Sequence, residues 1–233
     1  MSTRGTYRFS GSTDWSPTVT VYNHCDNYPI GGAALLYNTL VHESKGCMGT
    51  QFLRANAATE ITTDPDDHGD TEYHYEVIGS GPGATLQVRH RTWPDGCGDD
   101  GQWDVIFDGR LHEFLAQEFA VETPDWCAKW HGVFTPFREV EMPYGRKVLL
   151  NLKMAEQYLE RPHSCLNNLR VWKGKHEGSQ NWKASELEAL RIVSAFPELG
   201  NDEIYSLTGV KQLLADLETP VAAPAAIECD VPW

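Results

Sequence analysis

The spacing of apolar residues changes along this chain, and the change limits the folds that the chain can adopt. Two short runs rich in Tyr, Phe, Val and Thr predict strands at Thr6–Ser10 and Thr18–Tyr22. Three later runs, separated by turns rich in Gly, Pro and Asp, predict an antiparallel meander: Glu72–Ile78, Thr85–Thr92 and Trp103–Phe107. The first half is therefore expected to be rich in strands.

One helix is expected among these strands. Pro29 suits the first turn of a helix, because it has no amide hydrogen to lose there. Apolar residues follow at helical spacing as far as Val41, so we expect an amphipathic helix that Gly46 ends. Residues 55–70, rich in Asn, Thr and Asp, are expected to form a loop.

Helical spacing prevails beyond Arg110. Leu111–Phe119 predicts a helix, Arg138–Met142 a strand and Lys147–Leu159 another helix, while Ser185 and Glu188 form a capping box ahead of a further helix. Strands first and helices later are typical of an α+β protein. We expect an antiparallel sheet with a packed helix in the N-terminal half and a mostly helical C-terminal half.

The expected organisation has three parts. Residues 1–122 form an α+β domain, 123–219 a mostly helical region and 220–233 a mobile tail. The chain begins without an apolar signal segment and holds no apolar run of about 20 residues, so a cytoplasmic location is expected, away from membranes. In that reducing compartment the six cysteines are expected to be free thiols.

Acidic residues outnumber basic ones, and they concentrate in the first half. The protein has 233 residues with 19 basic and 33 acidic side chains, which gives a net charge of 19 − 33 = −14. Residues 1–120 carry 7 − 17 = −10, whereas 129–183 carry 10 − 5 = +5. This excludes a general nucleic-acid binder, because such binding depends on Lys and Arg. It predicts an acidic interaction surface, with two ordinary solvated faces as the alternative.

The acidic loops supply the candidate partner-binding residues. An EF-hand loop beginning at Asp64 would need a carboxylate at its twelfth position, where Tyr75 stands, so an exposed acidic loop is favoured over a calcium site. The candidates are Asp64, Asp66, Asp67, Asp70, Asp95, Asp99, Asp100 and Asp104.

Other candidates for chemistry are weaker. His24 and Asp26 lie between a strand and a helix and could bind metal or move a proton, but a turn in which Asp26 or Asn27 caps the helix is favoured. Two thiols and two imidazoles could hold zinc at irregular spacing, although neighbouring tryptophans favour a packed corner; they are Cys127, His131, His163 and Cys165.

Signature motifs of hydrolases, P-loop NTPases and zinc proteases do not occur in the sequence. We therefore assign no catalytic residue and no cofactor. A non-enzymatic function is favoured, and an enzyme whose groups come together from distant positions stays open.

The opening of the chain resembles small uncharacterised proteins of bacteriophages and mobile elements. Those proteins begin Met-Ser-Thr-Arg, run into a strand, and show His, Asp and Tyr-Pro before an alanine-rich helix, as Met1–Phe9, His24, Asp26, Tyr28-Pro29 and Gly31–Ala34 do here. The similarity covers about forty residues, and Asp26-Asn27 replaces the expected Asp-Gly. The resemblance implies a phage or mobile-element protein that acts inside a bacterium, and it carries over no catalytic residue.

Phage proteins of this size and charge often inhibit host defence, as anti-CRISPR and anti-restriction proteins do. We therefore expect an inhibitor, most specifically an anti-CRISPR protein, whose carboxylates bind a basic nucleic-acid-binding surface of a bacterial defence protein or nucleoprotein complex stoichiometrically. It would not bind nucleic acid directly. The alternatives are a metal-dependent enzyme and a structural protein that oligomerises through its helical half.

Overall fold

The computed structural model describes eight stretches of the chain: residues 3–11, 17–42, 46–63, 68–93, 101–120, 134–142, 145–160 and 180–199. The chain divides into two compact units. The first comprises Met1–Arg138 with Leu149–Met154, and the second comprises Glu139–Val148 with the chain from Ala155 onward.

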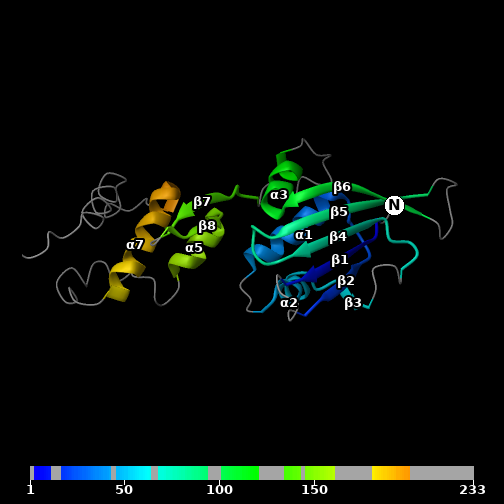
Figure 1. The fold of residues 1–233 in the computed structure, drawn as a ribbon, viewed down its shortest axis with the longest axis horizontal. Helices are drawn as coiled ribbons and strands as arrows, with labels where there is room; N and C mark the ends of the chain where they lie inside the picture. Colours follow the sequence, from blue (N-terminus) through cyan, green and yellow to red (C-terminus); the bar gives the residue numbers. More distant parts are fainter. Residues whose placement is uncertain are drawn as a thin grey trace, which may run out of the picture. The chain divides into compact units, whose positions relative to one another are not determined.

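A six-stranded sheet with the order β3-β2-β1-β4-β5-β6 forms the centre of the first unit (Figure 1). Its strands are β1 (Gly5–Ser10), β2 (Val19–Asn23), β3 (Thr59–Thr62), β4 (Tyr73–Ile78), β5 (Thr85–Thr92) and β6 (Gln102–Arg110). β1 and β4 run parallel, and the other neighbouring pairs are antiparallel. β3 and β6 are the two edges.

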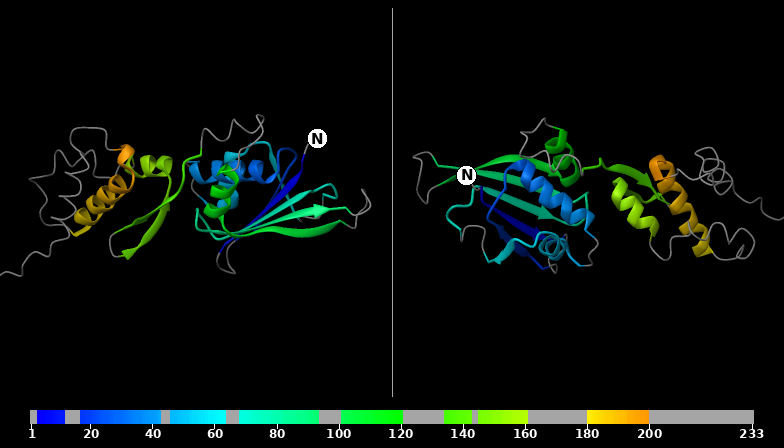
Figure 2. Two further views of the ribbon diagram at one scale, coloured as in Figure 1. Left: turned by 90° about the horizontal axis from the view of Figure 1, so that it is seen from above. Right: turned by 180° about the vertical axis from the view of Figure 1, so that it is seen from behind.

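Three helices cover one face of this sheet (Figure 2). They are α1 (Pro29–Val41), α2 (Met48–Ala55) and α3 (Leu111–Ala120). The core between the layers is aromatic and aliphatic, and its fully buried members include Tyr7, Val21, Leu36, Phe52, Tyr75, Leu86 and Leu115. Burying each large apolar side chain contributes about 1.5–3 kcal/mol, so this layer contact stabilises the unit.

No described helix or strand covers the opposite face of the sheet, which we call the open face. The strand register places one row of side chains across it, consisting of Glu60, Tyr22, Thr6, His74, Arg89 and Val105. Most of this row is polar, whereas the same strands direct Tyr7, Val21 and Tyr75 into the core. The sheet therefore has one packed face and one polar face, as half-buried antiparallel strands commonly do.

The second unit includes parts of a two-stranded sheet and three helical elements. The strands are β7 (Arg138–Glu141) and β8 (Lys147–Leu150), and the helices are α5 (Leu152–Glu160), α7 (Gln180–Ala195) and the 3-10 helix η5 (Pro197–Leu199). Glu188 of α7 accepts hydrogen bonds from Arg146 at 3.2 Å and from the Tyr158 hydroxyl at 2.7 Å. Ile192, one helical turn after Glu188, and Phe196, just after the end of α7, are buried.

The α+β class is confirmed, with a mostly antiparallel sheet and helices packed on it. The meander β4-β5-β6 and the first two strands are confirmed as well. The expected parts 1–122, 123–219 and 220–233 stay predictions, because much of 123–219 and all of 220–233 lie outside the described residues.

Four local predictions are wrong. The expected loop over 55–70 contains β3, a four-residue edge strand too short to show a period. Lys147–Leu159 is a strand followed by a helix, because the Asn151 side chain accepts the Met154 amide hydrogen bond at 2.8 Å and starts α5 there. Ser185 lies inside α7, which begins at Gln180, so it is not at the start of the helix. α1 ends at Val41, ahead of Gly46.

Gly32 allows α1 to lie directly against Tyr75. A Cβ atom at Gly32 would lie 2.4 Å from the Tyr75 ring and hydroxyl. Tyr75 is fully buried and its hydroxyl donates to the Asn27 carbonyl at 2.8 Å, so it has no room to move. The sequence Gly31-Gly32 near the start of a helix is therefore a packing requirement.

We expect Gly32→Ala to lower the free energy of unfolding by about 1–3 kcal/mol through this overpacking. Helix propensity alone would favour alanine by about 1 kcal/mol, so a net loss isolates the clash. The control is Gly83→Ala, where no atom lies within 4 Å of the new Cβ and the change should stay within about 0.5 kcal/mol. Urea unfolding measures both, and equal stabilities of the two variants would contradict the packing argument.

Candidate functional site

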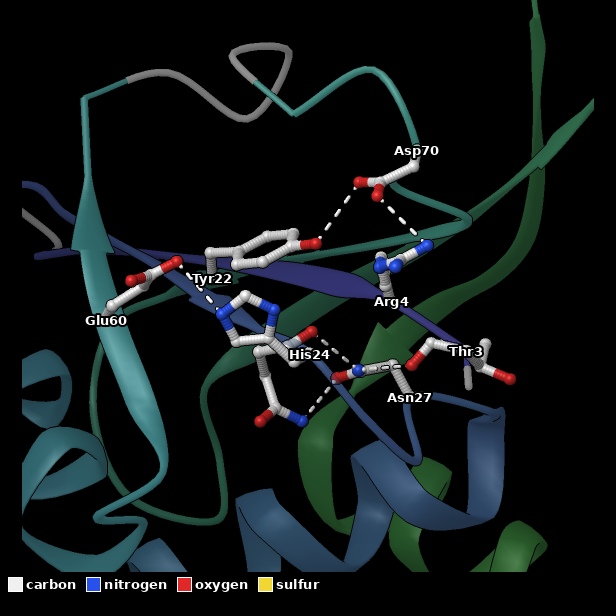
Figure 3. A network of polar contacts seen from close by, with 8 residues as sticks. Thr3, Arg4, Tyr22, His24, Asn27, Glu60 and Asp70 are labelled. Carbon is white, nitrogen blue, oxygen red and sulfur yellow. Dashed lines mark hydrogen bonds and ion pairs between the residues drawn. The ribbon is translucent and has the colours of Figure 1, made fainter. Parts of the chain in front are cut away.

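The turn between β2 and α1 is held by the buried side chain of Asn27. Its amide nitrogen donates to the carbonyls of Thr3 at 2.8 Å, Asn23 at 2.9 Å and Cys25 at 3.0 Å, and its amide oxygen accepts from the Tyr7 hydroxyl at 2.8 Å. Figure 3 shows part of this network. Because all these bonds are made within the chain, the turn is fixed to β1, to the residue Thr3 ahead of it and to the end of β2.

This turn exposes three chemically reactive side chains, His24, Cys25 and Asp26. His24 Nε2 lies 3.1 Å from Glu60 Oε1 on β3, and Asp26 has a φ of 59° that non-glycine residues rarely adopt. The expected alternative, a helix cap from Asp26 or Asn27, is wrong. The N-cap residue is Tyr28, without a side-chain cap hydrogen bond, and the Asn27 amide is used across the turn.

A second group of polar side chains closes over Tyr22 on the open face. The His68 ring stacks on the Tyr22 ring with centroids 3.7 Å apart, and the Tyr22 hydroxyl donates to Asp70 at 3.1 Å. Arg4 forms an ion pair with the other Asp70 oxygen at 3.0 Å (Figure 3). Residues 68–70, which lead from β3 to β4, are thereby fastened onto the sheet.

A carboxylate hydrogen-bonded to an imidazole orients the ring, so His24 with Glu60 has the parts of an acid–base pair. Tyr22 is not a partner in it at neutral pH, because burial, and then the nearby Asp70, raise its pKa to about 12. Among the described residues, no group of three or more His, Cys, Asp or Glu is placed to hold a metal ion.

Cys47 is an exposed thiol at the N-cap of α2. Its Sγ lies 3.2 Å from the Thr50 hydroxyl, and this hydrogen bond, helped by backbone amides in the first turn of the helix, lowers the thiol pKa. Cys25 and Cys47 are both in the thiol form, as expected, and both are exposed. A thiol with a lowered pKa at a helix N-terminus is more nucleophilic at neutral pH than an unperturbed one.

Most of the sequence candidates lie outside the described residues. These are Asp64, Asp66, Asp67, Asp95, Asp99 and Asp100, together with the weak zinc candidates Cys127, His131, His163 and Cys165. Two of the eight aspartates are described, and they differ in surroundings. Asp70 is paired with Arg4, whereas Asp104 is exposed on β6 and accepts a 3.4 Å hydrogen bond from Thr92.

The edge strand β6 exposes a mixed acidic and apolar surface. Val105 and Ile106 are 55% and 45% exposed, which is unusual for adjacent aliphatic residues in a strand. Asp104, Asp108 and Glu113 are also exposed at this edge, with Asp104 and Asp108 on opposite sides of β6 because they lie opposite His90 and Gln87. None of the three forms an ion pair with a described Lys or Arg. We call these five residues the β6 surface.

A β-bulge shapes this surface. The β5–β6 register passes from Val88 opposite Phe107 to Arg89 opposite Val105, so Ile106 is an extra residue without a partner. The Arg110 amide at the end of β6 is already bonded to the Glu113 carboxylate at 2.9 Å. Bulges and charges close an edge to pairing with another strand, so a partner would meet β6 through side chains.

Sequence reasoning missed the apolar half of the β6 surface and the Glu60 partner of His24. The run Val105-Ile106-Phe107 breaks the alternation of a strand, and that break was the available signal for a bulge. No such signal existed for Glu60, because β3 is too short.

Comparison with protein-family models, with curated proteins and with solved structures finds no match. Within the described part of the chain, no helix combines the length and the apolar character that crossing a bilayer requires. The pair of His24 and Glu60 and the β6 surface are therefore interpreted from their own geometry.

We expect Tyr22→Phe to lower stability by about 1 kcal/mol at pH 7, because it removes the hydroxyl that bonds Asp70. The pKa of Tyr22 is raised from 10 to about 12 in the folded protein, so its stabilising effect is complete below pH 10 and is lost as the pH rises through about 12. The stability gap between wild type and variant should shrink over that range in urea titrations. Parallel pH profiles would contradict the Tyr22–Asp70 contact.

Thr50→Val should slow alkylation of Cys47, since it removes the hydroxyl that lowers the thiol pKa. Mass spectrometry of iodoacetamide labelling between pH 6 and 10 measures the rate at each cysteine. The midpoint of the Cys47 profile should move to higher pH in the variant, while Cys25 in the same sample provides the internal reference. An unchanged Cys47 midpoint would show that Thr50 does not set its reactivity.

Proposed function

We propose that this protein is an inhibitor of a bacterial defence system, encoded by a phage or a mobile element, and that it acts by stoichiometric binding rather than by catalysis. An anti-CRISPR protein is the most specific form of the proposal. The partner is a defence protein or nucleoprotein complex, and the surface it offers is a basic one that normally binds nucleic acid.

The observation that carries the proposal is the β6 surface. Its carboxylates are not neutralised within the described residues, so they are available to attract Lys and Arg side chains. Exposed aliphatic side chains beside them supply apolar area, which holds a complex together after charges have steered the encounter. Charged surfaces with a small apolar centre are typical of specific protein interfaces.

The sequence around β6 adds to this charge. Residues 94–113 contain six acidic residues and one basic residue, a net charge of 1 − 6 = −5. They include Asp95, Asp99 and Asp100, which belong to the connection between β5 and β6. We therefore retain these three as partner-binding residues, with Asp104. Asp70 contributes less, because Arg4 neutralises it.

The proposal also includes the setting of the protein. A defence inhibitor acts in the host bacterial cytoplasm, where its target is found, and it needs neither a cofactor nor direct contact with nucleic acid. Residues 123–219 are taken as a mostly helical region that follows the binding unit.

Plating of phage on bacteria that carry defined CRISPR–Cas or restriction systems tests the proposal. Expression of the protein should restore plating against at least one such system. Asp104→Lys with Asp108→Lys should weaken the inhibition at least about tenfold, because it reverses the charge that meets a basic partner. Full retention of inhibition by this variant would exclude the β6 surface.

Two matched controls isolate the surface. Glu156→Lys reverses one carboxylate charge at an exposed position on α5, as each substitution of the double variant does, and should leave inhibition intact. Ile106→Ser should weaken inhibition, whereas Ile61→Ser should not, although Ile61 is 71% exposed on the opposite edge strand. Equal effects at both edges would indicate general instability instead of a binding surface.

A second candidate function is acid–base catalysis at the pair of His24 and Glu60. The 3.1 Å contact between them is the observation that favours it. His24→Gln would abolish such an activity and leave inhibition through β6 unchanged, so the two functions are separable. The metal-dependent form of this candidate would also require stoichiometric metal in purified protein.

A further inference from the structure

A pocket of about 360 Å³ opens beside α1 in the first unit. Its walls are mainly apolar and come from Ala34, Leu35 and Val41 of α1 and from Phe119 of α3. Pockets that bind small molecules have volumes of about 300–1,000 Å³ and similar apolar walls, with a few polar groups that fix orientation. The volume therefore suits a small ligand.

The pocket is rigid on its amide side. Asn56 donates from its side chain to the carbonyls of Phe52 at 3.0 Å and Leu35 at 3.3 Å. Asn38 donates to the Ala55 carbonyl at 2.8 Å and to the Asn56 amide oxygen at 3.2 Å. These two amides line the pocket, but they donate these hydrogen bonds to groups of the chain itself, so they shape the pocket more than they recognise a ligand.

Lys153 is the charged side chain among the described residues of the lining. Within those residues no Asp or Glu lines the pocket, and Lys153 forms no ion pair with a described carboxylate. Its ammonium group therefore lies beside apolar walls without a described counter-charge. In a protein with a net charge of −14, a cation placed away from carboxylates favours an anionic ligand.

The backbone around Lys153 is fixed to α1. The Tyr37 hydroxyl, which lines the same pocket, accepts hydrogen bonds from the Asn151 side chain at 3.0 Å and from the Thr135 amide at 3.2 Å. Asn151 is fully buried and in turn accepts the Met154 amide at 2.8 Å. The segment that carries Lys153 is thus held against the helix that forms the pocket wall.

We propose that this pocket binds a small organic anion, a monocarboxylate with an apolar body. The carboxylate meets the Lys153 ammonium at the rim, and the apolar body lies against Leu35, Val41 and Phe119. The site is independent of the β6 surface and of the inhibitor function proposed for it.

Titration of the full-length protein with [1-13C]octanoate, followed by NMR of the labelled carboxyl carbon, tests the site. Octanoate should bind, and Lys153→Met should weaken binding at least tenfold. Lys147→Met is the control, because it removes an ammonium that is also exposed but pairs with Glu139 instead of lining the pocket. It should bind octanoate as the wild type does.

Two further measurements keep the outcome unambiguous. Unlabelled 1-octanol, the neutral counterpart, should compete at least tenfold more weakly than unlabelled octanoate. Ala34→Phe should abolish octanoate binding by filling the pocket, and Lys153→Met carries the test if that variant fails to fold. The proposal is overturned if wild type does not bind octanoate, if Lys153→Met binds as wild type does, or if both lysine variants lose affinity equally. Phage plating with Lys153→Met should be unchanged.

Discussion

The buried amide of Asn27 is the contact on which the first unit depends. One side chain binds the backbone ahead of β1, the end of β2 and the turn into α1, while its backbone carbonyl accepts the hydroxyl of Tyr75 from β4. Loss of such a group would leave several buried donors and acceptors without partners, each at a cost of about 1–3 kcal/mol. The rigid presentation of His24 and the position of α1 on the sheet both follow from this amide.

Packing on one face only explains where the candidate sites lie. The helices occupy the apolar face of the sheet, so exposed chemistry is left to the open face, to the edges and to the outer side of the helical layer. The pair of His24 and Glu60 lies at the β3 side, the β6 surface forms the other edge, and the pocket opens beside α1. The pair of His24 and Glu60 and the β6 surface use parts of the fold that the core does not need, so substitutions there need not unfold the protein. The pocket, in contrast, shares Tyr37, Val41 and Phe119 with the core.

The elements with a clear period could be predicted from the sequence, and those set by tertiary contacts could not. Thr85–Thr92 was predicted as a strand with the bounds it has, because Leu86 and Val88 alternate with polar residues and turn residues precede and follow the run. Glu60 escaped prediction because its strand owes its existence to pairing with Tyr22 and its neighbours. Aspartate counts identified the charge of the β6 region, but they could not separate Asp104 from Asp70, which finds Arg4 only in the folded chain.

The parallel pairing of β1 with β4 has a consequence for how the protein reaches its fold. Thr6 and His74 are neighbours in the sheet and hydrogen-bond at 2.9 Å, yet 68 residues separate them. Contacts this distant form only after a long loop has closed. The chain therefore loses conformational entropy before the contacts stabilise it, which makes them slow to form. During synthesis β1 must wait for β4 to leave the ribosome, so the hairpin of β1 and β2 and the Asn27 turn are the parts that can assemble first.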